Sequence, residues 1–155
     1  MEAVLLLGGN VGDVHAAFSK AERHLVARAG AIRSRSRDHV TEPWGFTDDR
    51  LFLNRALVLD TELAPDALMR TCLGIEVELG RVRDGADAPK ARTIDIDILF
   101  IGDRIIDTPG LRVPHPRVHQ RAFALGPAAD VVPDLVHPER HRTVLQLLND
   151  VLQQA

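Results

Sequence analysis

The chain has 155 residues, a formal net charge of −3 and 45% hydrophobic residues, which predicts one domain with a substantial core and excludes a largely disordered chain. The pI near 6.1 gives no overall positive field, so we expect no nucleic-acid partner, and the single Cys72 excludes both an internal disulfide and a cysteine zinc cluster. The apolar start is too short for a signal peptide and no apolar run reaches membrane-spanning length, so we expect a cytoplasmic protein without a membrane partner.

The first elements alternate between strand and helix. Residues 3–7 form an apolar run that predicts a strand, and residues 8–13 (GGNVGD) predict a tight turn. Apolar residues at helical spacing over 14–29 predict an amphipathic helix with Asp13 as its N-cap. Residues 32–40 alternate and carry three arginines on one face, which predicts an exposed strand at a sheet edge with these arginines in solvent.

The middle of the chain repeats this pattern. Residues 41–50 (TEPWGFTDDR) predict a loop, and residues 51–59 predict the next strand. Pro65 opens a second helix, in which Cys72 belongs to the buried face, and Gly80 ends it. The chain then enters a polar loop.

Another strand follows over residues 93–101. The turn residues Gly102 and Asp103 predict a hairpin that brings a short partner strand over 104–106 against it. Prolines break the following stretch into short helical turns, and residues 143–154 predict a final amphipathic helix.

The order of elements favours an α+β fold, with helices packed against a mostly antiparallel sheet in a single domain over residues 1–155. A doubly wound parallel sheet is the weaker alternative, because two helices cannot supply enough parallel crossovers.

Two carboxylates interrupt the strand over 93–101. Asp95 and Asp97 are two positions apart, so their side chains project from the same face with Cα atoms roughly 6.5 to 7 Å apart. Unpaired carboxylates so close together would repel and lose hydration. A bound cation resolves this conflict, and two metal ions held roughly 3.5 to 4 Å apart could be bridged by such a pair. Oxygen ligands favour magnesium or manganese.

A cationic loop leads into this strand. Residues 81–92 contain Arg81, Arg83, Lys90 and Arg92, and guanidinium groups bind phosphate oxygens through two parallel hydrogen bonds. Together with the aspartates they indicate a phosphoryl-transfer site. The alternative is that these arginines form surface salt bridges with nearby acids.

The glycine-rich segment over residues 8–13 lies between a strand and a helix, where a phosphate loop could lie. Its spacing fits neither the P-loop nor the dinucleotide motif, so we interpret it as a tight turn.

Aromatic and polar residues suggest a site for a planar ligand. Aromatic rings could enclose a flat heterocycle while an amide bonds its edge. The alternative is that the phenylalanines belong to the core and the tryptophan covers it. The residues concerned are Thr41, Trp44, Phe46, Phe52, Asn54 and Phe123.

Four histidines are spaced as two pairs, His115 with His119 and His137 with His141. A zinc site is disfavoured, because a proline inside each spacing disrupts the helix that would align the ligands. His115 instead lies between two prolines as a rigidly held imidazole able to donate to a phosphate, with Arg121 nearby in sequence.

These motifs resemble, in order and spacing, the 6-hydroxymethyl-7,8-dihydropterin pyrophosphokinase family of folate biosynthesis. They are LLLGGNVGD (5–13), TEPWG (41–45), FLN (52–54), IEVELGRVR (75–83), ARTIDIDILFIG (91–102) and VPHPRVHQRAF (113–123). The resemblance implies a ferredoxin-like α/β/α sandwich and transfer of pyrophosphate from ATP to the hydroxymethyl group of the pterin, with release of AMP.

The resemblance also implies roles for individual residues. Asp95 and Asp97 resemble the ligands of two Mg²⁺ ions, and Arg81 and Arg92 would act with them in catalysis. The nucleotide contacts would come from Glu76, Arg83, Ile98, His115 and Arg121. The pterin pocket would be formed by Thr41, Trp44, Phe52, Asn54 and Phe123.

The substrates would therefore be ATP and hydroxymethyl-dihydropterin, and we expect a monomer. Two other classes stay open on the residues alone. One is another two-metal nucleotidyl- or phosphoryl-transfer enzyme, and the other is a ferredoxin-like module that binds a ligand without catalysis.

Overall fold

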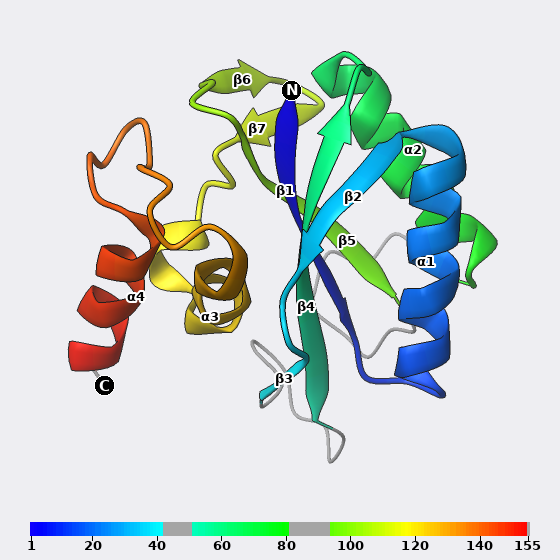
Figure 1. Ribbon diagram of the computed structural model, residues 1–155, viewed down its shortest axis with the longest axis horizontal. Helices are drawn as coiled ribbons and strands as arrows, with labels where there is room; N and C mark the ends of the chain where they lie inside the picture. Colours follow the sequence, from blue (N-terminus) through cyan, green and yellow to red (C-terminus); the bar gives the residue numbers. More distant parts are fainter. Residues whose placement is uncertain (42–50, 81–93, 155) are drawn as a thin grey trace.

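The computed structural model describes residues 1–41, 51–80 and 94–154, and it places a sheet between two layers of helices (Figure 1). Within these residues the main sheet has five strands: β1 (Glu2–Gly9), β2 (Gly30–Arg35), β3 (His39–Thr41), β4 (Phe52–Thr61) and β5 (Asp95–Ile101). The strand order is β2-β4-β1-β5, β3 also pairs with β4, and every pairing is antiparallel. The predicted α+β class with an antiparallel sheet is confirmed.

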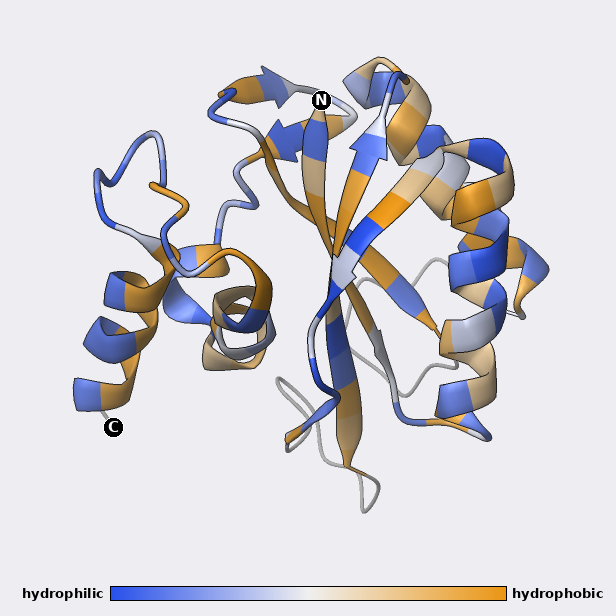
Figure 2. Ribbon diagram, viewed as in Figure 1, coloured by the Kyte–Doolittle hydropathy of each residue, from blue (hydrophilic) through white to orange (hydrophobic). Residues whose placement is uncertain are grey.

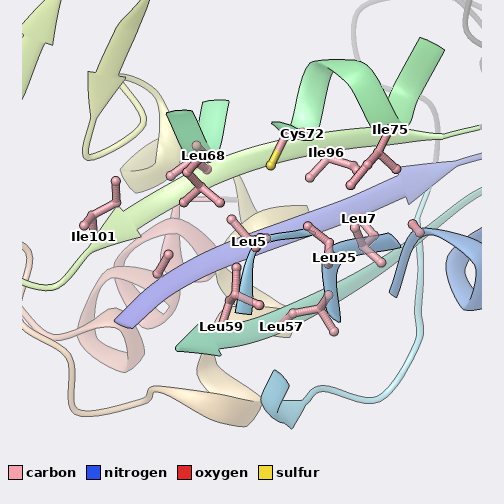
Figure 3. Packing of buried hydrophobic residues seen from close by; sticks show 14 of the residues in the cluster. Leu5, Leu7, Leu25, Leu57, Leu59, Leu68, Cys72, Ile75, Ile96 and Ile101 are labelled. Carbon is pink, nitrogen blue, oxygen red and sulfur yellow. The ribbon is translucent and has the colours of Figure 1, made fainter. Parts of the chain in front are cut away.

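Two helices cover one face of the sheet, α1 (Val14–Arg28) and α2 (Pro65–Glu78). The predicted cap of α1 is confirmed, since the Asp13 carboxylate accepts the Ala16 N–H at 3.0 Å. Figure 3 shows Cys72 and Ile75 of α2 packed near Ile96 of β5. Cys72 is fully buried, as its place in the predicted helix indicates, and burial raises the pKa of its thiol to about 12.

The opposite face is covered by α3 (Ala122–Val131), which packs on β1, β3 and β4, and by α4 (Val144–Gln153), which packs on α3. A short 3-10 helix, η1 (Val118–Gln120), precedes α3. The hydrophilic residues of α4 occupy the side of the helix that faces away from the rest of the molecule (Figure 2). The helix begins with a capping box between Thr143 and Gln146. The predicted final helix is therefore confirmed.

The single strand predicted over residues 32–40 is wrong, because the chain forms two strands, β2 and β3. Ser36 separates them: its N–H donates to the Ala56 carbonyl at 2.9 Å, and its hydroxyl oxygen accepts the Ala56 N–H at 2.8 Å. The predicted position at a sheet edge is confirmed, since both strands pair only with β4 among the described residues.

The arginines of this segment lie in solvent as predicted, each in an ion pair. Arg33 contacts Asp60 at 2.7 Å, and its side chain is 61% exposed. The other two pairs are Arg35 with Glu22 and Arg37 with Asp130.

The predicted hairpin over residues 104–106 is also wrong. The chain turns after β5, where Gly102 has a φ of +51° and the Arg104 N–H donates to the Ile101 carbonyl at 3.0 Å. The next strands, β6 (Ile106–Thr108) and β7 (Leu111–Val113), pair with each other in a separate sheet. They do not extend the main sheet. At the outer edge of β5, the N–H of Ile96 is bonded to Glu76 and the carbonyl of Leu99 is bonded to the N–H of His115.

The proline-rich segment contains more regular helix than expected. Pro127 lies inside the ten-residue helix α3, where it removes only the one hydrogen bond that its nitrogen would have made. Across residues 1–41, 51–80 and 94–154, no helix is both long enough and apolar enough to cross a membrane.

Candidate active site

The paired aspartates lie on the α3 face of the sheet. Ile96 and Ile98 point into the core beneath α1 and α2, so Asp95 and Asp97 project from the opposite face of β5. Both are partly exposed, whereas the other five residues of this strand are buried. The structure therefore gives the two carboxylates the common face that their spacing predicts.

A row of three residues crosses the sheet beside them. Gly8 of β1 pairs with Asp95 of β5 on one side and with Asn54 of β4 on the other. A Cβ atom at Gly8 would lie 3.1 Å from the Asn54 side-chain oxygen. Because Gly8 has no side chain, no side chain stands between Asp95 and Asn54 in this row.

Sequence reasoning missed this role for Gly8. The tight turn predicted over residues 8–13 is partly wrong, because Gly8 and Gly9 belong to β1. The turn is centred further on, where Gly12 has a φ of +70°. Only the pairing of β1 with both neighbours reveals that Gly8 lies between two predicted site residues.

His115 is held beside the aspartates by its backbone and its ring. Its N–H donates to the Leu99 carbonyl at 2.9 Å, at an irregularity in the pairing of β1 and β5. Its Nδ1 accepts the Arg117 N–H at 3.2 Å, which leaves the ring proton on Nε2. Burial, and then the positive charge of Arg121, lower the pKa of His115 to about 4, while Asp95 opposes the shift. At neutral pH the ring is an uncharged N–H donor.

Arg121 belongs to the same group of charges. Burial lowers the pKa of its guanidinium, and the charges of Asp97 and Asp95 act in the opposite direction. The guanidinium carbon lies 5.4 Å from the centre of the Phe123 ring. The structure thus brings His115 and Arg121 close to the two aspartates.

The second histidine pair is unsuited to zinc for a reason that the sequence does not show. The Nδ1 atom of His137 accepts the N–H groups of Glu139 and Arg140 at 3.1 and 3.2 Å. The proton therefore lies on Nε2, so neither ring nitrogen has a lone pair to offer to a metal.

Glu76 and Ile98 lie at or near the outer edge of β5. Glu76 is 1% exposed, and its Oε2 accepts the Ile96 N–H at 2.7 Å. Since peptide groups alternate in direction along an antiparallel strand, those of Ile98 face the same outer edge as those of Ile96. The position predicted for the nucleoside is therefore an edge with outward-facing peptide groups.

Four residues predicted for the planar ligand come from neighbouring elements. Thr41 pairs with Phe52, and the Asn54 side-chain nitrogen donates to the Thr41 hydroxyl oxygen at 2.9 Å. Phe52 and Asn54 are two positions apart, so they share the α3 face. Phe123 is partly buried at the start of α3, which packs on β3 and β4.

The remaining predicted site residues lie outside the described residues. They are Trp44 and Phe46 of the loop over 41–50, and Arg81, Arg83, Lys90 and Arg92 of the cationic loop.

The donor set fits magnesium better than zinc. Within the described residues, no group of three or more histidine, cysteine, aspartate or glutamate side chains is placed to hold a metal. Magnesium usually binds through one or two carboxylates and completes its shell with water and substrate phosphate oxygens. Asp95 and Asp97 supply that number of carboxylates, next to neutral and cationic donors suited to phosphate.

The fold and these side chains define a class, an α+β protein with a candidate site for metal-dependent phosphate transfer. The model of the 7,8-dihydro-6-hydroxymethylpterin-pyrophosphokinase (HPPK) family matches residues 4–133. The chain belongs to this family, and the resemblance stated from its motifs is confirmed.

Curated relatives agree with this assignment. The 2-amino-4-hydroxy-6-hydroxymethyldihydropteridine pyrophosphokinase of Methylorubrum extorquens is 46% identical over 135 residues, which cover 86% of this chain and 84% of the relative. The Pseudomonas aeruginosa protein of the same name is 41% identical over 140 residues, which cover 87% of this chain and 83% of the relative.

Solved structures show the same fold at low sequence identity. Wild-type Plasmodium falciparum HPPK-DHPS with SDX-DHP matches with a TM-score of 0.77 and 18% identity, over 99% of this chain and 44% of that chain. An HPPK-DHPS in complex with substrates matches with a TM-score of 0.75 and 14% identity, over 99% of this chain and 43% of that chain. This chain spans less than half the length of these two solved chains. The expected ferredoxin-like α/β/α sandwich is confirmed.

Proposed function

We propose that this chain transfers the pyrophosphoryl group of ATP to the hydroxymethyl oxygen of 6-hydroxymethyl-7,8-dihydropterin and releases AMP. The hydroxymethyl oxygen forms the new bond to the β-phosphorus, and the bond between the β-phosphorus and the oxygen that bridges it to the α-phosphorus breaks. The bridging oxygen leaves with AMP, and the hydroxyl proton is released to solvent. The observation that carries the proposal is the row Asp95, Gly8 and Asn54, in which a residue without a side chain separates the carboxylate pair from the amide suited to a heterocycle.

The phosphate side of the site consists of carboxylates and hydrogen-bond donors. Asp95 and Asp97 would hold two Mg²⁺ ions, which supply charge neutralisation for the triphosphate and for the leaving AMP. His115 would donate its Nε2 proton in a hydrogen bond to a phosphate oxygen, and Arg121 would add a charged donor. The outward-facing peptide groups of Ile98 would bond the nucleoside.

Further phosphate contacts belong to the cationic loop. Arg81 and Arg92 would stabilise the transferred group, and Arg83 would contact the nucleotide, with Glu76 close to the same edge of β5.

The pterin side would use residues of a different character. Asn54 would bond the edge of the heterocycle, and Thr41 would hold the amide of Asn54 in place. Phe52, Phe123 and Trp44 would supply apolar ring faces for the planar pterin. We also propose that the enzyme acts as a cytoplasmic monomer.

Product analysis tests the proposal. The purified chain is incubated with hydroxymethyl-dihydropterin and ATP labelled on the γ-phosphate, with and without Mg²⁺, and the products are separated by chromatography. We expect AMP and labelled pterin diphosphate in equal amounts, only when Mg²⁺ is present. ADP with a pterin monophosphate, or free phosphate as the main product, would refute the pyrophosphokinase assignment and favour another two-metal phosphoryl-transfer enzyme.

A further inference from the structure

The peptide group between the two aspartates is held by a buried carboxylate. Ile96 is the residue between Asp95 and Asp97, and its N–H donates to Glu76 Oε2 at 2.7 Å. Glu76 lies on α2, twenty positions earlier in the chain, and is 1% exposed. A hydrogen bond to a carboxylate is short and strong, and burial shields it from competing water.

The position of β5 explains why this bond is needed. Among the described strands β5 is the last of the sheet, so only one of its edges is paired with β1. The N–H of Ile96 points to the other edge, although Ile96 itself is only 3% exposed. Without Glu76 this donor would be buried and without a protein acceptor in the described structure, which is strongly unfavourable.

Glu76 is 1% exposed, so its carboxylate is shielded from bulk solvent where it meets the strand. The nearby Cys72 thiol supports the closeness of Glu76 to the site, because both Glu76 and Asp97 add to the effect of burial in raising the pKa of that thiol. The carboxylate of Glu76 therefore lies at the outer edge of β5, next to the peptide group between the two aspartates.

We propose that Glu76 is a positioning residue, which fixes β5 at Ile96 and thereby sets the spacing of Asp95 and Asp97 for binding of divalent cations. The side chains at positions i and i+2 keep their separation only while the strand between them stays extended. If the N–H of Ile96 loses its partner, the end of β5 becomes free to distort and the two carboxylates no longer present a fixed pair. This role of Glu76 depends on the proposed pyrophosphokinase function only for the choice of ATP as the phosphate substrate.

Three variants separate the hydrogen bond from the charge. Glu76→Gln keeps an acceptor oxygen for the Ile96 N–H but removes the charge, whereas Glu76→Ala removes both. Glu76→Asp keeps the charge but shortens the side chain by one methylene, so the acceptor withdraws from Ile96. Glu78→Ala is the matched control, because Glu78 lies on the same helix and its carboxylate pairs with Arg28 at 2.6 Å on the surface.

Two measurements report on the position of the strand. Amide hydrogen exchange at Ile96, followed by NMR, should be faster by about 10- to 100-fold in Glu76→Ala and Glu76→Asp, and within about threefold of wild type in Glu76→Gln. Mn²⁺ titration followed by electron paramagnetic resonance, with the bound probe α,β-methylene-ATP, should show affinity weakened about tenfold in the same two variants. Glu78→Ala should match wild type in both measurements.

The outcomes distinguish the two proposals. Unchanged Mn²⁺ affinity in a folded Glu76→Ala or Glu76→Asp protein would overturn the positioning role, and so would an affinity lost as much in Glu76→Gln. If Glu76→Ala does not fold, the comparison of Glu76→Asp with Glu76→Gln decides. A chain that makes no pterin diphosphate would refute the proposed function, while the Ile96 exchange rates would still judge the role of Glu76.

Discussion

The absence of a side chain at Gly8 gives a prediction whose size follows from the structure. In Gly8→Ala the new Cβ would lie 3.1 Å from the Asn54 side-chain oxygen, so that oxygen must move by a few tenths of an ångström. Asn54 is 3% exposed and its nitrogen is bound to Thr41 at 2.9 Å, so the amide has little room to adjust. Losing one well-formed hydrogen bond to the pterin costs about 1 kcal/mol, which is about a fivefold loss of affinity.

Steady-state kinetics and thermal unfolding test this prediction together. The KM for the pterin should rise about fivefold in Gly8→Ala while the KM for ATP stays unchanged. The free energy of unfolding should change little, because alanine gains about 0.5 to 1 kcal/mol over glycine in a strand and this offsets the tight contact.

A second glycine provides the control. A Cβ at Gly74 of α2 has no neighbouring atom within 4 Å, so Gly74→Ala should leave both KM values unchanged and stabilise the helix by up to about 1 kcal/mol. An unchanged pterin KM in Gly8→Ala, or an equal rise in both KM values, would refute the placement of the pterin beside Asn54.

Three further predictions concern catalysis, pH and stability. Asp97→Ala should lower turnover by about three orders of magnitude without unfolding the protein, and retained Mg²⁺-dependent activity would remove Asp97 from the mechanism. Because the pKa of His115 is lowered to about 4 from its usual 6.5, the unfolded chain takes up a proton at a higher pH than the folded protein does. The stability that depends on the neutral ring is therefore complete above pH 6.5 and is lost as the pH falls towards 4. The free energy of unfolding in urea should fall between pH 7 and pH 4.5 by about 2 kcal/mol less in His115→Gln than in wild type. An equal fall in the two proteins would contradict the lowered pKa of His115. In Gly30→Ala the new Cβ would overlap the Asp60 carbonyl oxygen, so unfolding in urea should show a loss of about 3 kcal/mol, and an unchanged midpoint would contradict this close approach.

Local patterns were sufficient for the elements that build the core. The helical spacing over residues 14–29 and the apolar run over 3–7 predict α1 and β1, because each buries one face or lies wholly within the sheet. The same patterns could not separate β2 from β3. That division depends on the hydroxyl of Ser36, whose partner Ala56 is twenty positions away.

The site shows the same division between local and distant information. The common face of Asp95 and Asp97 follows from their spacing alone, because a strand repeats every two residues. Gly8 could not be assigned, because its role depends on the registers of two strand pairs that join distant segments. The orientation of the His115 ring also needed the structure, since the Arg117 N–H fixes which nitrogen carries the proton.

The outer edge of β5 is partly covered by hydrogen bonds from other parts of the chain. An unpaired strand edge is a site where other chains can add by hydrogen bonding, and proteins usually cover it. Here Glu76 bonds the N–H of Ile96 and the N–H of His115 bonds the carbonyl of Leu99. Ile98 lies between these two points, with peptide groups that face the same edge. These two bonds leave a short segment of the edge between them. The same bonds hold the strand at the aspartates on one side and hold His115, which we propose as a phosphate donor, on the other.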